Sequence, residues 1–489
     1  MLKLYNTLTK KVEVFKAIRK NEVRAYFCGM TVQDEPHIGH ARSFIVMDVL
    51  VRYLRYLGYK VFFVRNITDI DDKIIKKAQD EGITTFEVAE RYIRRSMKAF
   101  DALKLLPPNV EPRATCHIIE IIELIKKLID KGYAYVAPNG DVYYRVKRFK
   151  DYGKLSGQNI KDLEAGKRVE PGEYKEDPLD FALWKAAKPG EPSWTSPWGE
   201  GRPGWHIECS AMSMKYLGET FDIHGGGSDL IFPHHENEIA QSEAATGKKF
   251  ANYWLHVGLV NFAGDKMSKS LGNVVKVLEL LEIYDSEVIR YWAISTHYRK
   301  PIEFSERAMN VAEKSLDKLY YWIFTLELES QNRESGAVRD NVKMFIANLE
   351  KNFREAMNDD LNTPKALGIL HSGLKFVSEV FGRLNKEEMS AIAGIYRKLG
   401  SILGILEESL EERINEKIKR KRPLGEVLPK SYNVSSGTDV ARFIDLIIDV
   451  RSKLRAEKKY DLADYIRDEL RKLGVVLEDT KQGTKWSFA

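Results

Sequence analysis

The stretch VRAYFCGMTVQDEPHIGHARSFIVMDVLVRYLRYLGYKVFFVR, residues 23–65, decides the fold. Residues 23–28 are a short apolar run that ends at Gly29, which is typical of a buried strand. From about Ile38, apolar residues recur at three- and four-residue steps until Gly58, which indicates a helix with a glycine stop. Residues 60–65 predict a second buried strand. Strand, helix and strand in this order predict a βαβ unit and a parallel sheet.

Downstream of this unit, the chain predicts a mixed α/β segment. Residues 117–130 predict an amphipathic helix, and Asn139–Gly140 predicts the turn of a following hairpin. The Gly/Pro/Trp-rich stretch 189–205 is too punctuated for regular structure, so we expect a long loop there. Residues 220–227 predict another strand of the sheet, and 233–247 predict a helix with proline near its start.

The last third of the chain differs in character. Helical periodicity dominates from 308 to about 420, interrupted at 359–364. A basic stretch, 413–422, contains Lys417, Lys419, Arg420, Lys421 and Arg422, and 423–439 is typical of a linker. The final fifty or so residues predict helices and a small closing hairpin.

Composition limits the class of protein. The 489 residues are 44% hydrophobic and 30% charged, which is typical of several globular domains. No apolar run approaches the roughly 18 residues of a membrane span, and the first residues do not look like a secretory signal. Three cysteines cannot form a disulfide framework. We expect a cytoplasmic protein with reduced thiols and no membrane partner, and the net charge of +6 is weak support for a polyanionic one.

Two short segments offer a way to bind a nucleotide, because the chain has no G-x-x-x-x-G-K-[ST] or G-x-G-x-x-G loop. His37 and His40, with Gly39 between them, lie where a strand gives way to a helix, so helix amides and imidazoles could meet phosphate. Lys266 and Lys269 could place positive charge on a leaving pyrophosphate. Each segment alone is ordinary, since a histidine pair is more often structural and a lysine loop is usually solvated surface.

A metal site is also indicated. Zinc prefers thiolate, imidazole and carboxylate ligands, and Cys28 ends the first strand while Cys209 lies in GWHIECS. His234 and Glu238 are four positions apart on a predicted helix and therefore share a face. Taken singly, a cysteine is often just a small buried side chain, and such a His–Glu pair is more often a surface contact. The zincin motif H-E-x-x-H is absent.

Together these segments resemble the HIGH and KMSKS signatures of class I aminoacyl-tRNA synthetases. The resemblance to cysteinyl-tRNA synthetase covers nearly the whole chain. It is carried by FCGMTVQDEPHIGHAR (27–42), NITDIDDKI (66–74), PLDFALWKAAKPGEPSWTSPWGEGRPGWHIECSAMS (178–213), FDIHGGGSDLIFPHHENEIAQSEA (221–244), KMSKSLGN (266–273), DDLNTPKAL (359–367) and KKYDLADYIRDELRKLGVVLEDTKQGTKW (458–486).

The resemblance implies a set of site residues. One zinc ion per chain is expected on Cys28, Cys209, His234 and Glu238, with His206, His224 and His235 as alternative ligands. ATP is expected to bring Mg²⁺, with His37 and His40 on its phosphates and Lys266 and Lys269 on pyrophosphate. Further ATP or cysteine contacts are expected from Gly29, Thr31, Gly39, Trp205, Asp229 and Lys269. Two residues depart from the usual family pattern, namely Met30 and Gln33.

The implied activity is cysteine–tRNA ligation by a monomer acting on L-cysteine, ATP and tRNA(Cys). Two alternatives remain, a cysteine:amine ligase of the mycothiol pathway and a non-catalytic tRNA-binding paralogue. The expected fold class is α/β, a Rossmann-like parallel-sheet catalytic domain with an α/β insertion, followed by an α-helical bundle and a small C-terminal domain. The expected segments are a first catalytic half (1–115), a connective-peptide insertion (116–199), a second catalytic half with the zinc ligands (200–258), a KMSKS and stem-contact region (259–307), a helical anticodon-binding bundle (308–422), and a linker with a small tRNA-binding domain (423–489).

Overall fold

The structure is a computed structural model that forms two compact units, Met1–Leu410 and Glu411–Ala489. The residues it describes are 1–159, 174–262, 265–266, 274–413, 447–448, 451–452, 454–456, 459–472, 475–480 and 483–488. Within these residues, no helix has both the length and the apolar character needed to cross a bilayer.

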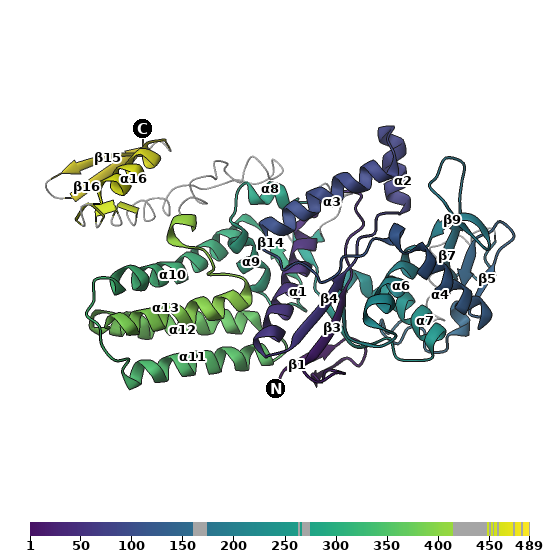
Figure 1. Ribbon diagram of the computed structural model, residues 1–489, viewed down its shortest axis with the longest axis horizontal. Helices are drawn as coiled ribbons and strands as arrows, with labels where there is room; N and C mark the ends of the chain where they lie inside the picture. The colour runs from purple at the N-terminus through teal and green to yellow at the C-terminus, as the bar shows by residue number, and fades with distance from the viewer. Residues whose placement is uncertain are drawn as a thin grey trace. The chain divides into compact units, whose positions relative to one another are not determined.

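A four-stranded parallel sheet in the order β11-β10-β3-β4 lies at the centre of the first unit. Its strands are β3 (Glu22–Phe27), β4 (Lys60–Arg65), β10 (Phe221–Gly227) and β11 (Ala251–Val257). Helix α1 (Ile38–Tyr56) connects β3 to β4 and contacts β4, β10, α9 (Ser286–Ile294) and α13 (Lys386–Leu403), which is why most of its residues are buried. The predicted βαβ unit and parallel sheet are confirmed (Figure 1).

An antiparallel sheet in the order β5-β6-β7-β9-β8 follows helix α4 (Ile118–Asp130). Its strands are β5 (Ala134–Val136), β6 (Val142–Tyr144), β7 (Phe181–Ala186), β8 (Trp194–Ser196) and β9 (Gly199–Pro203). The predicted turn at Asn139–Gly140 is confirmed, with Gly140 at a φ of 89°.

The prediction of an irregular loop over 189–205 is wrong, because β8 and β9 form an antiparallel hairpin there and β9 pairs with β7. Gly201 is needed for close packing rather than for a loop. A Cβ atom at that position would lie 2.3 Å from Nε1 of Trp184.

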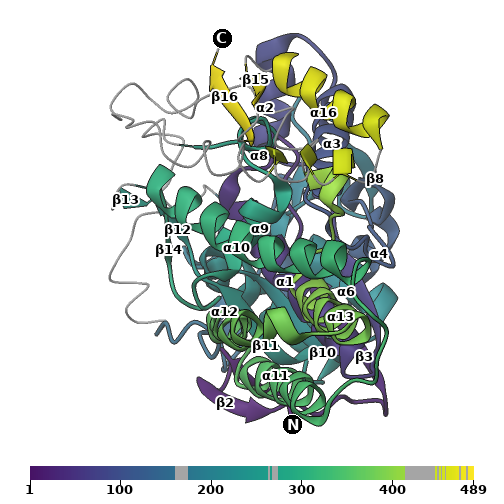
Figure 2. The ribbon, with the colours of Figure 1, turned by 90° about the vertical axis from the view of Figure 1, so that its left-hand side faces the viewer.

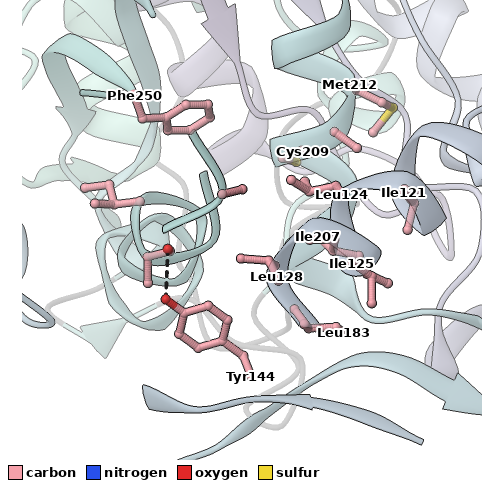
Figure 3. Packing of buried hydrophobic residues seen from close by; sticks show 14 of the residues in the cluster. Ile121, Leu124, Ile125, Leu128, Tyr144, Leu183, Ile207, Cys209, Met212 and Phe250 are labelled. Atoms are coloured by element: carbon pink, nitrogen blue, oxygen red, sulfur yellow. Dashed lines mark hydrogen bonds between the residues drawn. The ribbon is translucent and has the colours of Figure 1, made fainter. Parts of the chain in front are cut away.

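The core next to the antiparallel sheet includes residues of α4 and of the two helices, α6 (Trp205–Leu217) and α7 (Glu236–Thr246), that carry candidate ligands. Ile121, Leu124, Ile125 and Leu128 on α4 belong to one buried cluster with Ile207 and Met212 of α6 (Figure 3). The hydroxyl of Tyr144 donates a hydrogen bond of 2.9 Å to the carbonyl of Ala240 in α7. Apolar packing and this bond fix α6 and α7 beside the parallel sheet.

Most of the remaining first unit is helical. A small sheet in the order β13-β12-β14 joins β12 (Val260–Phe262), β13 (Asp265–Lys266) and β14 (Ile302–Phe304). The predicted helical region begins after it, and Figure 2 shows α11 (Asp340–Asn358), α12 (Thr363–Val380) and α13 nearly end-on. The other α-helices among the described residues of this unit are α2 (Asp72–Glu81), α3 (Thr85–Ala102), α8 (Val277–Leu281) and α10 (Glu306–Ser330).

The N-terminal strands β1 (Lys3–Asn6) and β2 (Lys11–Val14) form an antiparallel pair. In the second unit, helix α16 (Tyr460–Lys472) precedes β15 (Val475–Thr480) and β16 (Gly483–Phe488). These two strands are antiparallel, which confirms the predicted closing hairpin.

The predicted linker at 423–439 and the basic residues 417–422 lie outside the described residues.

Candidate metal centre and nucleotide pocket

A pocket of about 370 Å³ opens at the carboxyl ends of the four parallel strands. This edge is where open α/β sheets bind ligands, because strand ends and helix starts meet there. Ten of the residues predicted from the sequence line the pocket. They are Cys28, Gly29, Thr31, His37, Gly39, His40, Trp205, Cys209, Asp229 and His234.

The four predicted metal ligands converge beside this pocket; Cys28, Cys209 and His234 line it, and all four are buried. The two sulfurs of Cys28 and Cys209 are 4.0 Å apart, and Oε1 of Glu238 lies 3.6 Å from Sγ of Cys28. Nε2 of His234 lies 3.0 Å from the same carboxylate oxygen. His234 belongs to the short helical segment Ile231–His235 that leads directly into α7, so the four-residue spacing still places both side chains on one face.

His235 competes with Cys209 for a place in this set. Cys28, His234, His235 and Glu238 have donor atoms that all lie within 4.8 Å of one another. However, Nε2 of His235 contacts Sγ of Cys28 at 3.2 Å, and its Nδ1 contacts Nε2 of His256 at 2.8 Å. His235 does not line the pocket, whereas Cys209 and His234 do. Because the bound ion must face the pocket, we favour Cys209 over His235 as the fourth ligand.

The charges of the cluster fit a cation. Burial alone would raise the pKa of Glu238, but His224 and His234 outweigh burial and hold this pKa at about 2. Burial would lower the pKa of His234, but Glu238 and Cys209 raise it to about 10. The hydrogen bond from Cys28 lowers the pKa of the Cys209 thiol, while burial raises that of Cys28. A divalent cation on these side chains would displace the His234 proton and take over its positive charge.

The donor set also favours one kind of metal. Two thiols, one imidazole and one carboxylate are typical of tetrahedral zinc, whereas Mg²⁺ and Ca²⁺ prefer oxygen ligands throughout. The residues present therefore fit zinc, and their role as ligands stays a prediction.

Two of the alternative ligands lie behind this set. Nε2 of His224 contacts Oε2 of Glu238 at 2.8 Å, and Nδ1 of His206 contacts Nδ1 of His234 at 3.0 Å. The ring of Trp205 stacks on His234 with centroids 4.4 Å apart, and Trp205 remains 39% exposed. Trp205 is thus an aromatic wall of the pocket rather than a core residue.

The two histidines of the helix start cap one another. His37 is the N-cap of α1; its Nδ1 accepts a hydrogen bond from the amide of His40 at 3.4 Å, and Nδ1 of His40 accepts from the amide of His37 at 3.2 Å. The rings stack with centroids 3.6 Å apart. Because Nδ1 is the acceptor, a neutral ring must carry its proton on Nε2, which makes Nε2 a donor suited to phosphate oxygen.

The lysine segment is described only at its start. The backbone of Lys266 pairs with Asn261 between β12 and β13. Side chains at 265–266 and all of 267–273, including Lys269, lie outside the described residues. The predicted roles of the two lysines stay predictions.

Several pocket residues were not predicted. Asn66 follows β4 and accepts a hydrogen bond of 2.8 Å from the amide of Gly29, and Thr68 and Lys73 also line the pocket. All three belong to NITDIDDK, whose place directly after a buried strand was a usable signal. The two residues that depart from the family pattern, Met30 and Gln33, both line the pocket, and Met30 is buried.

Comparison with known proteins gives matches along the chain. A family model for the class I (C) tRNA synthetase catalytic domain matches residues 14–314. A DALR domain model matches 352–407, and a cysteinyl-tRNA ligase anticodon binding domain model matches 444–486.

Individual proteins match over nearly their whole length. The cysteine–tRNA ligase of Thermococcus gammatolerans is 48% identical over 99% of this chain and 98% of its own. Those of Caldicellulosiruptor saccharolyticus and Haemophilus influenzae are 49% and 46% identical over 99% of both chains.

Solved structures support the fold. Two structures of Mycobacterium tuberculosis methionyl-tRNA synthetase bound to methionyl-adenylate give TM-scores of 0.58 and 0.57 at 15% identity. They cover 87% and 84% of this chain and 94% and 92% of their own. At this identity the likeness shows the fold alone.

Proposed function

The chain belongs to the cysteine–tRNA ligase family, and from this premise we propose that Cys28, Cys209, His234 and Glu238 bind one zinc ion that selects the substrate by its sulfur. The chain is a class I ligase that forms an aminoacyl-tRNA ester, and cysteine, ATP and tRNA are its substrates. The observation that carries the proposal is the convergence of two thiols and one imidazole that line the pocket with one buried carboxylate beside them.

Selection by sulfur would keep the enzyme from activating serine. Cysteine and serine differ by one atom, and an apolar pocket distinguishes such similar side chains only weakly. A bound zinc ion would supply a soft Lewis acid that accepts a thiolate far better than a hydroxyl. Discrimination of about 10⁴ to 10⁵ is within reach of a site built on one specific bond, so no editing domain is needed.

The side chains around the ligands prepare this site. His224 donates to Glu238 and orients its carboxylate, and Trp205 covers His234 from the pocket side. Together they limit the motion of the ligands and restrict water at the point where the substrate sulfur would bind.

We assign the ATP end of the pocket to the N-terminus of α1. In the first step, a carboxylate oxygen of cysteine attacks the α-phosphorus of ATP, the bond to the β-phosphate oxygen breaks, and pyrophosphate leaves. Nε2 of His37 and of His40 would donate to the phosphates, and Lys266 and Lys269 would neutralise the leaving pyrophosphate. Gly29, Thr31, Gly39 and Asp229 line the same pocket and would contact cysteine or ATP, with Mg²⁺ on the ATP phosphates.

In the second step, the terminal ribose hydroxyl of tRNA attacks the activated carbonyl. The new ester bond forms, the bond from the carbonyl carbon to the phosphate oxygen breaks, and AMP leaves. We propose that 116–199 faces the acceptor stem and that the helical region and last unit bind the anticodon end. The match of 444–486 to an anticodon binding domain supports the latter.

One paired assay tests the proposal. Purified protein should catalyse ATP–pyrophosphate exchange with cysteine but not with serine, lose it when zinc is removed, and charge tRNA(Cys). A cysteine:amine ligase would exchange but not charge tRNA, and a non-catalytic paralogue would bind tRNA without exchange. Full cysteine-specific exchange by zinc-free protein would refute zinc selection while leaving the family assignment intact.

A further inference from the structure

Arg42 lies in α1 just after the two predicted phosphate histidines, but it does not line the pocket. Its side chain is fully buried, and among the described residues no carboxylate pairs with it. Instead, its guanidinium donates only to backbone carbonyls. The acceptors and distances are Gly258 at 2.7 Å, Leu259 at 2.9 Å, Lys300 at 2.6 Å and His297 at 3.4 Å.

These acceptors belong to two backbone segments, 258–259 and 297–302, which are also joined to each other by hydrogen bonds. The amide of Gly258 donates to the carbonyl of Tyr298 at 2.8 Å, and the amide of Ile302 donates to Leu259 at 3.0 Å. The contact is so close that a Cβ atom on Gly258 would lie 2.5 Å from the carbonyl oxygen of Lys300. Arg42 thus binds both segments where they meet.

The segment at 258–259 leads into residues 266–273, the lysine-bearing stretch that contains Lys266 and Lys269. Gly258 and Leu259 line the pocket and precede β12, which pairs with β13 at Lys266. The chain returns at Val275, whose carbonyl accepts a hydrogen bond of 2.9 Å from the amide of Ile38. Both ends of the stretch are therefore fixed to α1, the outgoing end by Arg42 and the returning end by the helix start.

Packing alone does not explain why an arginine is buried at position 42. Burying a guanidinium without a carboxylate partner costs free energy, which here is offset by hydrogen bonds to neutral carbonyls. Four carbonyls aimed at one planar cation define the position of two backbone segments in a way that apolar packing does not.

We propose that Arg42 is a positioning residue for the first chemical step, because it sets the distance between the phosphate-binding start of α1 and the outgoing end of the lysine-bearing stretch. The inference rests on the proposed function. It predicts that loss of Arg42 raises the KM for ATP or lowers the rate of ATP–pyrophosphate exchange, while metal and cysteine binding remain unchanged. The second step, from which no pyrophosphate leaves, should be unaffected.

The test compares Arg42→Lys with Arg290→Lys in the full-length protein. Lysine keeps the charge but cannot reach four acceptors on two segments. Arg290 is an equally buried arginine that binds Asp48 and the carbonyls of Leu103 and Leu403, away from the pocket, and it is the matched control. Zinc content, cysteine Kd, the KM for ATP in exchange and the rate of transfer from enzyme-bound adenylate are measured for each.

For Arg42→Lys, we expect the KM for ATP or the exchange rate to worsen about 10- to 100-fold, since misplacement by about 1 Å can cost that much. Zinc content, cysteine Kd and the transfer rate should stay within about twofold of the wild type, and Arg290→Lys should lose stability without a change in the KM for ATP. Exchange kinetics like the wild type would overturn the proposal. Equal losses in ATP use, cysteine binding and transfer would also overturn it, because they indicate general distortion.

If Arg42→Lys does not fold, Gly258→Ala tests the same junction with Arg42 in place. Its added methyl group must push Lys300 away, so the same selective loss of ATP use is expected. Unchanged ATP kinetics in that variant would overturn the proposal. Absence of cysteine-dependent exchange in the wild type would instead refute the proposed function, so the two failures are distinguishable.

Discussion

His224 and Glu238 meet inside the first unit, with Nε2 of the imidazole 2.8 Å from Oε2 of the carboxylate and both side chains fully buried. The other carboxylate oxygen of Glu238 faces His234 and Cys28. One carboxylate is thus held from behind by a histidine while its free side faces the candidate metal ligands. Partners of this kind fix the orientation of a ligand and tune its affinity for the metal.

We therefore expect His224→Gln to weaken zinc binding about 10- to 100-fold without removing a ligand. Competition with a chelator, followed by metal analysis, measures the change. His371→Gln is the control, because His371 is a partly buried histidine that bonds Tyr291 in the helical region. Equal zinc affinity in the two variants would contradict the role given to His224.

Cys209→Ser should lose zinc and cysteine activation together. A serine hydroxyl is not deprotonated at neutral pH and is a poor zinc ligand, so one of four ligands is removed. Metal analysis of dialysed protein and ATP–pyrophosphate exchange measure the two losses. Cys116→Ser is the matched control, because Cys116 is exposed and outside the pocket. Full zinc content with normal exchange in Cys209→Ser would end the ligand assignment.

Lys269→Ala should lower the rate of exchange about 10²- to 10³-fold while ATP still binds, because the missing charge acts mainly on the leaving pyrophosphate. Rapid kinetics of adenylate formation and equilibrium binding of ATP separate the two effects. Lys249→Ala changes an exposed lysine away from the pocket and should behave as the wild type. Unchanged exchange in Lys269→Ala would count against the KMSKS assignment.

The stability of the helical region should depend on pH through Glu388. Its carboxylate accepts hydrogen bonds from the amide, Nε and Nη2 of Arg339, and these lower its pKa to about 2 despite burial. Since the pKa in the unfolded chain is about 4.3, this contribution is complete above that pH and is lost as pH falls towards 2. Glu388→Gln should cost about 2 kcal/mol at pH 7, because the charge-assisted bonds are removed.

Denaturant unfolding of the wild type and Glu388→Gln at pH 7, 4 and 2.5 measures this dependence. The difference between the two proteins should shrink as the pH falls, and Glu379→Gln, an exposed change on α12, should show no such trend. A constant difference at all three pH values would show that the effect does not arise from the charge of Glu388.

The basic stretch should contribute to tRNA binding by neutralising phosphates. Replacing Lys417, Lys419, Arg420, Lys421 and Arg422 by glutamine should reduce the slope of log affinity against log salt by about 0.7 to 0.9 for each phosphate that is no longer neutralised. Exchange with cysteine should be unchanged, because it needs no tRNA. Affinity titrations at four salt concentrations measure the slope, and an unaltered slope would assign these residues to a solvated surface.

The sequence predicted the parallel sheet well because its strands are buried on both faces and stand out as apolar runs. The run at 23–28 and that at 60–65 became β3 and β4, and the helix between them ends beside Gly58 as expected. The loop predicted for 189–205 was wrong because glycine and proline normally interrupt strands, and this stretch is rich in both. Here Gly201 is a strand residue, since only glycine fits against Trp184.

The candidate site was predicted in its residue types but not in its surroundings. Motif spacing and family resemblance indicated Cys28, Cys209, His234 and Glu238, which the fold brings together from three separate parts of the chain. His256 could not have been predicted, because its place beside His235 depends on the pairing of β10 with β11. Such contacts across strands leave no local signal in a sequence.

The distance along the chain between Cys28 and Glu238 is 210 positions, although the two side chains nearly touch. During synthesis on the ribosome, a nascent chain that stops short of α7 therefore lacks one of the four donors. Almost half of the polypeptide must emerge before the complete set can assemble. Products that terminate before Glu238 would then carry an incomplete set and could not select the amino acid through it.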